Sequence, residues 1–153
     1  MKVADVMTTE MHTLSPDTTW QKAAELFVRW GVSSAPVVDQ HARLIGMISE
    51  KMLFRGLFPS YGDWLTSPET YLDFDTMERD AVNRTGERLV NEIMRTDLIT
   101  TTPDEPVLKV GALMVARNFH QVPVVQHGKV VGMVQRGTIY REILRKYFDI
   151  QHH

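Results

Sequence analysis

The chain of 153 residues carries 19 acidic and 17 basic side chains and no cysteine. This balance gives no electrostatic reason to expect a nucleic-acid partner, and without cysteine the chain can form neither a disulfide bond nor a thiolate site. No apolar run follows Met1 and none elsewhere is long enough to cross a membrane, so we expect a soluble, cytoplasmic protein with no membrane partner.

The first predicted elements are a short helix or turn at residues 3–7 and an extended piece that ends at Pro16. Asp17 can then serve as the N-cap of a helix. The apolar side chains that follow keep the spacing of a helix with one buried stripe; they are Ala23, Leu26, Phe27 and Trp30. Gly31 is expected to end this helix, because glycine readily adopts the left-handed conformation.

Two short β-rich runs come next, at residues 35–38 and 44–48, and a polar turn joins them. This pattern is typical of a β-hairpin. A second helix is expected at residues 51–57. The first half of the chain therefore reads strand, helix, strand, strand, helix.

The second half of the chain repeats the first. Pro36-Val37-Val38 recurs 87 positions later as Pro123-Val124-Val125. After one residue is dropped, Gly46-Met47 falls on Gly132-Met133. Such a repeat predicts one structural unit used twice.

The elements of the second half follow the same order. Asp104 takes the place of the helix cap, and Asn118 stands where Gly31 stood and favours the same left-handed backbone. The predicted buried stripe is Val110, Leu113 and Met114. Two strands are expected at 122–125 and 129–134, and a last helix from Gly137 to about Phe148. Each half alone is only marginally large enough to fold, so we expect the halves to depend on each other.

Residues 58–88 have no copy in the repeat. Aromatic side chains gather in this insert and just before it, at Phe54, Phe58, Tyr61, Trp64, Tyr71 and Phe74. Thr66-Ser67-Pro68-Glu69 has the composition of a helix start and predicts a helix over 69–83. This helix carries enough apolar surface to pack on the body of the protein or across a dimer contact.

The repeated elements resemble the cystathionine-β-synthase (CBS) domain family, in which two repeats pair into a Bateman module. The matching motifs are Asp5-Val6-Met7 with Glu92-Ile93-Met94, Thr13-Leu14-Ser15-Pro16-Asp17 with Thr100-Thr101-Thr102-Pro103-Asp104, and the two Pro-Val-Val strands with their Gly-Met-Ile and Gly-Met-Val partners. The resemblance places the first CBS repeat at 2–57, the insert at 58–88, the second repeat at 89–148 and a tail at 149–153. The aromatic segments Leu57-Phe58-Pro59-Ser60-Tyr61 and Tyr71-Leu72-Asp73-Phe74 resemble the insert of small free-standing bacterial members. The final Gln151-His152-His153 resembles the remnant of a purification tag.

The resemblance implies an α/β (α+β) fold of tandem βαββα repeats about a pseudo-twofold axis, with the insert between them. It also implies a regulatory module that senses a ligand and is not an enzyme. In this family, two clefts between the repeats commonly hold adenine nucleotides (AMP, ADP or ATP) or S-adenosylmethionine, and no cofactor is required. A homodimer and an unidentified effector protein are the implied partners.

The resemblance also assigns residues to each cleft. The first cleft would be lined by Thr13, Ser33, Ser34, Ala35, Ile48 and Ser49. The second would be lined by Thr100, His120, Gln121, Val122, Gln135 and Thr138, with Arg136 as the best phosphate partner and Lys51 and Arg55 as weaker candidates in the first cleft. Apolar side chains on the second helices are expected to meet a second chain, at Met52, Leu53, Phe54, Ile139, Ile143 and Leu144.

Both repeats depart from the ribose-binding motif of the family. Met52 and Thr138 stand where a carboxylate belongs, and Gln135 replaces the hydroxyl that Ser49 keeps. Ser49 and Thr138 serve equally well as helix caps, and His120 is more often a surface histidine than a ligand contact. These departures keep open the alternative of a ligand-independent protein that dimerises or docks on an effector.

Catalytic signatures are missing from the sequence. It has no nucleophile elbow, phosphate-binding loop, dinucleotide glycine fingerprint or paired-histidine metal motif. We therefore assign no catalytic residue and no metal ligand.

Overall fold

The computed structural model describes residues 1–56, 79 and 86–151. The helix predicted over 69–83 and the final two histidines lie outside the described residues. The described helices and strands are η1 (Val3–Asp5), α1 (Trp20–Trp30), β1 (Ser34–Val38), β2 (Leu44–Ser49), α2 (Glu50–Arg55), α5 (Val90–Ile93), α6 (Val107–Arg117), β3 (Gln121–Gln126), β4 (Lys129–Gln135) and α7 (Arg136–Phe148). This confirms the mixed helix and strand class.

The predicted hairpins and second helices are present in both halves. The strands pair as two separate two-stranded sheets, β1 with β2 and β3 with β4. The extended piece expected before each first helix is reduced to a single parallel bridge, Leu14 with Val37 and Thr101 with Val124. Each half is therefore a hairpin flanked by two helices, with one bridge in place of the first strand.

The ends of α1 and α6 follow the sequence prediction, and their starts do not. Gly31 and Asn118 both adopt the left-handed conformation, with φ of 67° and 55°. Thr19, not Asp17, caps α1, and its hydroxyl accepts a hydrogen bond from Lys22 N at 3.1 Å. The cap position of α6 is Pro106, not an aspartate, and no side chain caps this helix.

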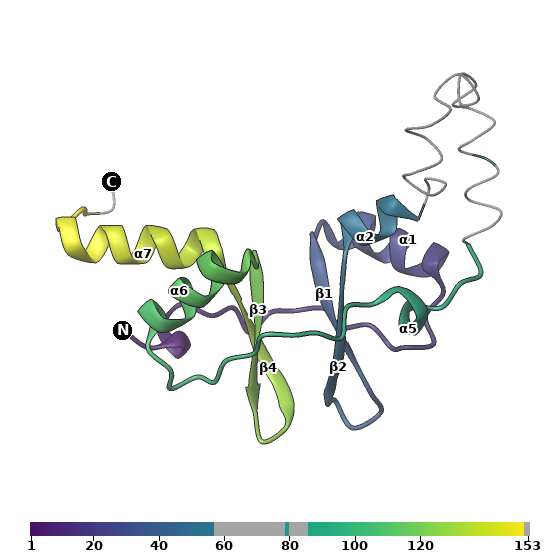
Figure 1. Ribbon diagram of the computed structural model, residues 1–153, viewed down its shortest axis with the longest axis horizontal. Helices are drawn as coiled ribbons and strands as arrows, with labels where there is room; N and C mark the ends of the chain where they lie inside the picture. Colours follow the sequence, from purple (N-terminus) through teal and green to yellow (C-terminus); the bar gives the residue numbers. More distant parts are fainter. Residues whose placement is uncertain (57–78, 80–85, 152–153) are drawn as a thin grey trace. The chain divides into compact units, whose positions relative to one another are not determined.

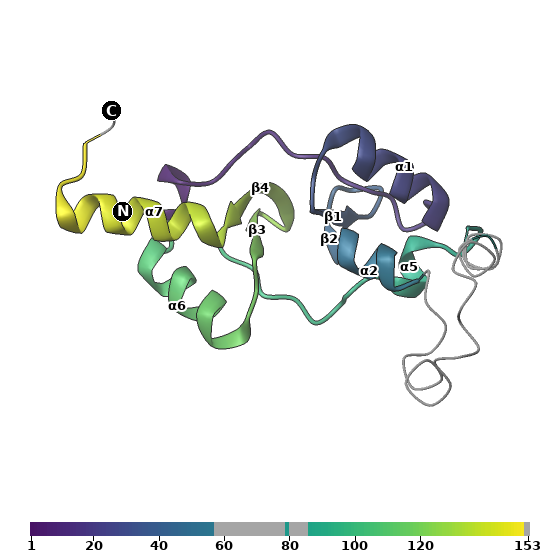
Figure 2. The same cartoon turned by 90° about the horizontal axis from the view of Figure 1, so that it is seen from above.

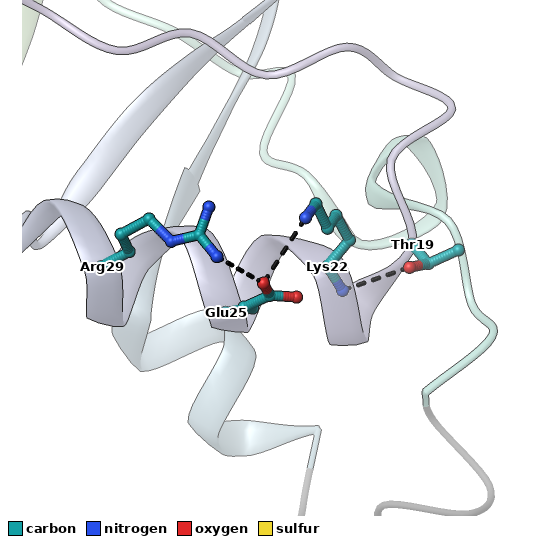
Figure 3. Close-up of polar contacts among 4 residues, drawn as sticks. All are labelled: Thr19, Lys22, Glu25 and Arg29. Carbon is teal, nitrogen blue, oxygen red and sulfur yellow. Dashed lines mark hydrogen bonds and ion pairs between the residues drawn. The ribbon is translucent and has the colours of Figure 1, made fainter.

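The exposed face of α1 is charged. Glu25 accepts contacts from Lys22 at 3.5 Å and from Arg29 at 2.8 Å, one turn to either side (Figure 3). These pairs lie in solvent and contribute little to stability. The opposite face buries Trp20, Ala23 and Phe27. The predicted Leu26 and Trp30 are only half-buried.

The chain forms two compact units whose boundaries do not follow the repeats. Of the described residues, the first-repeat unit holds 13–37, 45–56, 79 and 86–96, and the second-repeat unit holds 1–12, 38–44 and 97–151. The beginning of each repeat therefore belongs to the unit that contains the body of the other repeat.

In the second-repeat unit, α6 and α7 lie on the same side of the β3–β4 hairpin (Figures 1 and 2). The hairpin is antiparallel, with Gln121 opposite Gln135 and Val122 opposite Val134. Its buried core consists of Val3, Val107, Val110, Met114, Phe119, Val122, Val124, Val134 and Ile139. Leu113, expected in the stripe of α6, is exposed. Val3 enters this core from the N-terminus of the chain.

The N-terminal segment is tied to this unit by backbone hydrogen bonds. Val3 N donates to Glu105 O at 2.9 Å, and Thr8 and Met133 exchange two bonds of 2.9 Å each. The segment thus crosses β4 and supplies a fully buried valine to a core that the second repeat otherwise builds.

The first-repeat unit is built in the same way. Its core consists of Leu14, Trp20, Ala23, Phe27, Ala35, Val37, Ile48, Leu53 and Val90. The indole of Trp20 donates to Leu53 O at 3.1 Å and joins α1 to the end of α2. Met47 and Arg95 exchange backbone bonds of 2.9 and 2.8 Å, so the segment after α5 crosses β2.

Candidate functional site

One backbone hydrogen bond gathers the predicted site of the first repeat. Glu50 N, at the start of α2, donates to Ser33 O, just before β1, at 2.9 Å. Because β2 ends at Ser49, this bond places the end of β2 beside the start of β1. The bridge at Leu14, whose N donates to Pro36 O at 2.9 Å, brings Thr13 to the same strand. The six residues predicted for this site therefore lie around one end of the β1–β2 hairpin.

Ser49 is the N-cap of α2. Its hydroxyl oxygen accepts a hydrogen bond from Met52 N at 3.2 Å. Its proton can still donate to another group, because a hydroxyl is both donor and acceptor. The capping role weighed for Ser49 is therefore confirmed, and it leaves a donor at the hairpin end.

The equivalent hydrogen bond gathers the predicted site of the second repeat. Arg136 N, at the start of α7, donates to His120 O at 2.9 Å. Gln121 and Gln135 are opposite each other at the hairpin end. Thr100 reaches the same strand, because its neighbour Thr101 bonds to β3 through Pro123 O at 3.0 Å and Val125 N at 2.8 Å.

The Arg136 side chain is held by two neighbours. One guanidinium nitrogen lies 2.8 Å from His120 Nδ1, and the other donates to Asn118 Oδ1 at 3.4 Å. Arginine can only donate, so His120 Nδ1 is the acceptor in this contact. His120 thus positions Arg136.

Asn118 was predicted only as the residue that ends α6. Its left-handed backbone is the property that it shares with Gly31. The replacement of glycine by asparagine at this position could have indicated the contact from the sequence, because asparagine adds an amide that reaches Arg136.

Thr138 does not cap α7, so this part of the prediction is wrong. The helix starts at Arg136, its N-cap is Gln135, and the Gln135 side chain makes no capping bond. Thr138 is the third residue of the helix and is half-buried. Its hydroxyl lies three positions past the N-cap Gln135, inside the first turn, and so does not cap the helix.

The two sites differ in charge at equivalent positions. Glu50 is the first residue of α2, and Lys51 follows it; Arg136 is the first residue of α7, which has no acidic residue in its first turn. A helix N-terminus attracts anions, and a basic side chain there adds to the attraction. The site of the second repeat is therefore the more favourable of the two for an anionic group.

The described residues at these sites neither replace the missing carboxylate nor form a group that could hold a metal ion. Met52 is half-buried and packs against the core of the first-repeat unit, so its thioether does not act as a substitute for a carboxylate. Within residues 1–56, 79 and 86–151, no group of three or more potential ligands could hold a metal ion. In the same part of the chain, no helix is long and apolar enough to cross a membrane.

The repeated hairpin and helix define a known class of domain. The family model of the CBS domain matches residues 3–58 and 90–145, and the chain therefore belongs to the CBS domain family. Among curated proteins it is similar to the CBS domain-containing protein YhcV of Bacillus subtilis, with 28% identity over 137 residues that cover 90% of this chain and 81% of YhcV. It is also 26% identical to the chloroplastic protein CBSX1 of Arabidopsis thaliana, of which it spans only 60%.

Solved structures share the fold over nearly the whole chain. CBSX2 of Arabidopsis thaliana, in complex with AMP, has a TM-score of 0.72 and 24% identity, with 95% of this chain and 98% of CBSX2 covered. The CBS domain pair of protein MJ0100, in complex with 5′-methylthioadenosine and S-adenosyl-L-methionine, has a TM-score of 0.70, 24% identity and the same coverage. At this identity the likeness establishes the fold.

Proposed function

We propose that the chain is a regulatory module that senses an adenosine-containing ligand and is not itself an enzyme. The observation that carries the proposal is the backbone bond found in both repeats, from Glu50 to Ser33 and from Arg136 to His120. In each repeat this bond joins the start of the second helix to the residue before the first strand, and the residues predicted to bind ligand lie around this end of the hairpin. Structures of the same fold that hold AMP, 5′-methylthioadenosine and S-adenosyl-L-methionine support the ligand class.

The chemistry of the hairpin ends suits such a ligand. Backbone groups at the start of each first strand can pair with the edge of an adenine. The neighbouring Ala35 and Val122 are fully buried in the cores of their own units, so their side chains offer no surface to its flat face. We assign the sugar to the hydroxyl of Ser49 and the amide of Gln135. We assign phosphate to the second repeat, where Arg136 can form charge-assisted hydrogen bonds.

Thermal melts with AMP, ADP, ATP and S-adenosylmethionine test the proposal. A ligand present at 100 times its dissociation constant should stabilise the protein by about 2.7 kcal/mol. If none of the four raises the melting temperature, the sensing function is wrong in this form.

The competing function is a ligand-independent interaction protein. Ser49 already caps a helix and Met52 packs against a core, so neither residue requires a ligand to explain it. This alternative predicts that Arg136→Ala and Ser49→Ala leave every partner interaction unchanged, whereas the sensing function predicts the loss of ligand-dependent effects. A pull-down with and without AMP separates the two functions.

We further propose that the chain forms a homodimer through its helices. Leu53 and Ile139, expected at the contact, are buried within their own units, and Met52 and Ile143 pack against the same cores. Exposed apolar side chains include Val28 and Phe54 in the first-repeat unit, Leu108, Leu113 and Val115 on α6, and Tyr140, Leu144, Tyr147 and Phe148 on α7. Light scattering at micromolar concentration should report a dimer, and Phe54→Asp should shift it to a monomer.

A further inference from the structure

The turns at the tips of the two hairpins carry the same short motif. With the single gap of the repeat placed at Asp39, Gln40-His41-Ala42-Arg43 aligns with Gln126-His127-Gly128-Lys129. Each turn therefore reads glutamine, histidine, small residue, basic residue. The small residue has positive φ in both turns, 63° at Ala42 and 79° at Gly128.

The two turns meet within the second-repeat unit. Arg43 and Lys129, which are equivalent in the repeat, form an antiparallel bridge with each other, and Val130 N donates to Ala42 O at 3.4 Å. Together the turns line an open hollow of about 620 Å³. The lining residues are Gln40, His41, Ala42, Arg43, His127 and Lys129.

The side chains around this hollow are donors and cations. Arg43 and Lys129 are exposed, and neither forms a salt bridge with any residue that the structure describes. His41 lies beside the Gln40 amide, with 3.4 Å between their Nε2 atoms. The lining therefore contains two cationic residues, two histidines and a glutamine, and none of its described residues is acidic.

The nearby carboxylate of Asp39 serves the turn itself. It accepts hydrogen bonds from Arg43 N at 3.0 Å and from His41 N at 2.8 Å. The bond from the Arg43 backbone, with a smaller contribution from His41, holds the pKa of Asp39 below its usual value. Asp39 thus stabilises the turn that contains Arg43, and its carboxylate accepts both hydrogen bonds from backbone N–H groups of that turn.

We propose that this hollow, the turn site, binds a small phosphate-bearing anion such as a pyrophosphate group. Its volume lies in the range of small-molecule sites, and an arginine with a lysine facing it suits the separate oxygens of two linked phosphates. An extended polyanion such as nucleic acid is disfavoured, because the basic cluster is confined to two turns of a chain with a net charge of −2. The turn site shares no residue with the hairpin-end sites of the proposed function.

Titration calorimetry of the full chain with inorganic pyrophosphate tests the turn site. We expect one pyrophosphate to bind per chain and the R43Q/K129Q double variant to bind about 10–100-fold more weakly, because charge-assisted hydrogen bonds are lost. The matched control is R29Q/K109Q, which removes one exposed arginine and one exposed lysine elsewhere and should bind as the unmodified chain does. Both substituted residues of the double variant are on the surface, so its melting temperature should be unchanged.

A third variant, R136Q, separates the turn site from the proposed function. It should keep the binding event that R43Q/K129Q weakens and lose only a separate, weaker event at the start of α7, if pyrophosphate also binds there. The turn site is refuted if the unmodified chain shows no binding at millimolar pyrophosphate, or if R29Q/K109Q weakens binding as much as R43Q/K129Q does. It is equally refuted if R136Q abolishes binding while R43Q/K129Q does not, because the anion then binds at the start of α7.

Discussion

Two equivalent residues at the hairpin ends contribute differently to the helices that follow them. Ser49 closes the first turn of α2 through its bond to Met52 N, whereas its counterpart Gln135 makes no capping bond to α7. The first repeat thus uses its hydroxyl for the fold, and the second leaves its helix N-terminus uncapped beside Arg136.

Ser49→Ala should lower the free energy of unfolding by about 1 kcal/mol, since it removes a cap. Gln135→Ala should change it by less than about 0.5 kcal/mol, as expected for a surface substitution. Urea denaturation measures both. Ser49→Asp is the control that keeps a capping oxygen and should restore most of the loss; equal effects of the two alanine variants would contradict the capping role.

At the residue scale, the sequence predicted helix ends better than helix starts. Gly31 and Asn118 end their helices because few other residues adopt the left-handed conformation easily. The start of α1 was ambiguous because Asp17 and Thr19 can both cap a helix. Asp17 instead joins a turn in which Thr18 N donates to Ser15 O at 3.1 Å, and Thr19 is bridged to Leu89. The bridge to Leu89 depends on a distant segment, and local sequence does not contain it.

At the element scale, glycines on β2 and β4 allow another segment to cross the strand. A Cβ at Gly132 would lie 2.7 Å from the backbone oxygen of Thr8. A Cβ at Gly46 would collide mainly with the side chain of Met94, with Arg95 O at 3.2 Å. The repeated Gly-Met pair is thus explained by packing, because each crossing needs a strand residue without a side chain.

Gly132→Ala should destabilise the protein by about 1–3 kcal/mol, because the obstructing atom belongs to the backbone and overpacking forces the segment to shift. Gly46→Ala should cost less, since the methionine side chain can adopt another rotamer. Thermal unfolding of both variants checks the order. Gly137→Ala, in the first turn of α7, is the control and should be neutral or stabilising; a milder effect at Gly132 than at Gly46 would contradict the crossing geometry.

The sequence correctly predicted apolar faces on the second helices. For some residues of these faces it predicted the wrong contact. Leu53 and Ile139 were assigned to a dimer contact and are 5% and 0% exposed within a single chain. Periodicity identifies a face that avoids water, but a single sequence does not say whether the same unit or a second copy covers it.

At the scale of the whole molecule, the two repeats exchange their first segments. Val3 completes the core that holds Val110 and Ile139, and Val90 completes the core that holds Ala23 and Ile48. Both valines are fully buried. The repeat was visible in the sequence, but this exchange was not, because Val3 and Val90 are aligned with each other and either could have stayed with its own half.

Because of this exchange, neither half should fold alone. Separate chains of residues 1–57 and 86–153 should each lack a buried valine and several backbone bonds, and each should show no cooperative unfolding transition by circular dichroism. Mixing the two should restore the transition. A stable fold of either half by itself would show that the exchanged segments are dispensable.

The proposed sensing function also belongs to this scale, because it involves two hairpin ends that differ in charge. Their predicted residues are gathered by the same bond in each repeat, and only the second repeat adds an arginine held by His120. A phosphorylated ligand should therefore occupy one site per chain.

Titration calorimetry with AMP tests this account most directly. It should give one AMP per chain, at least tenfold weaker binding in Arg136→Gln, and unchanged binding in the control Arg29→Gln. Absence of binding at millimolar AMP, or full affinity in Arg136→Gln, would contradict the account.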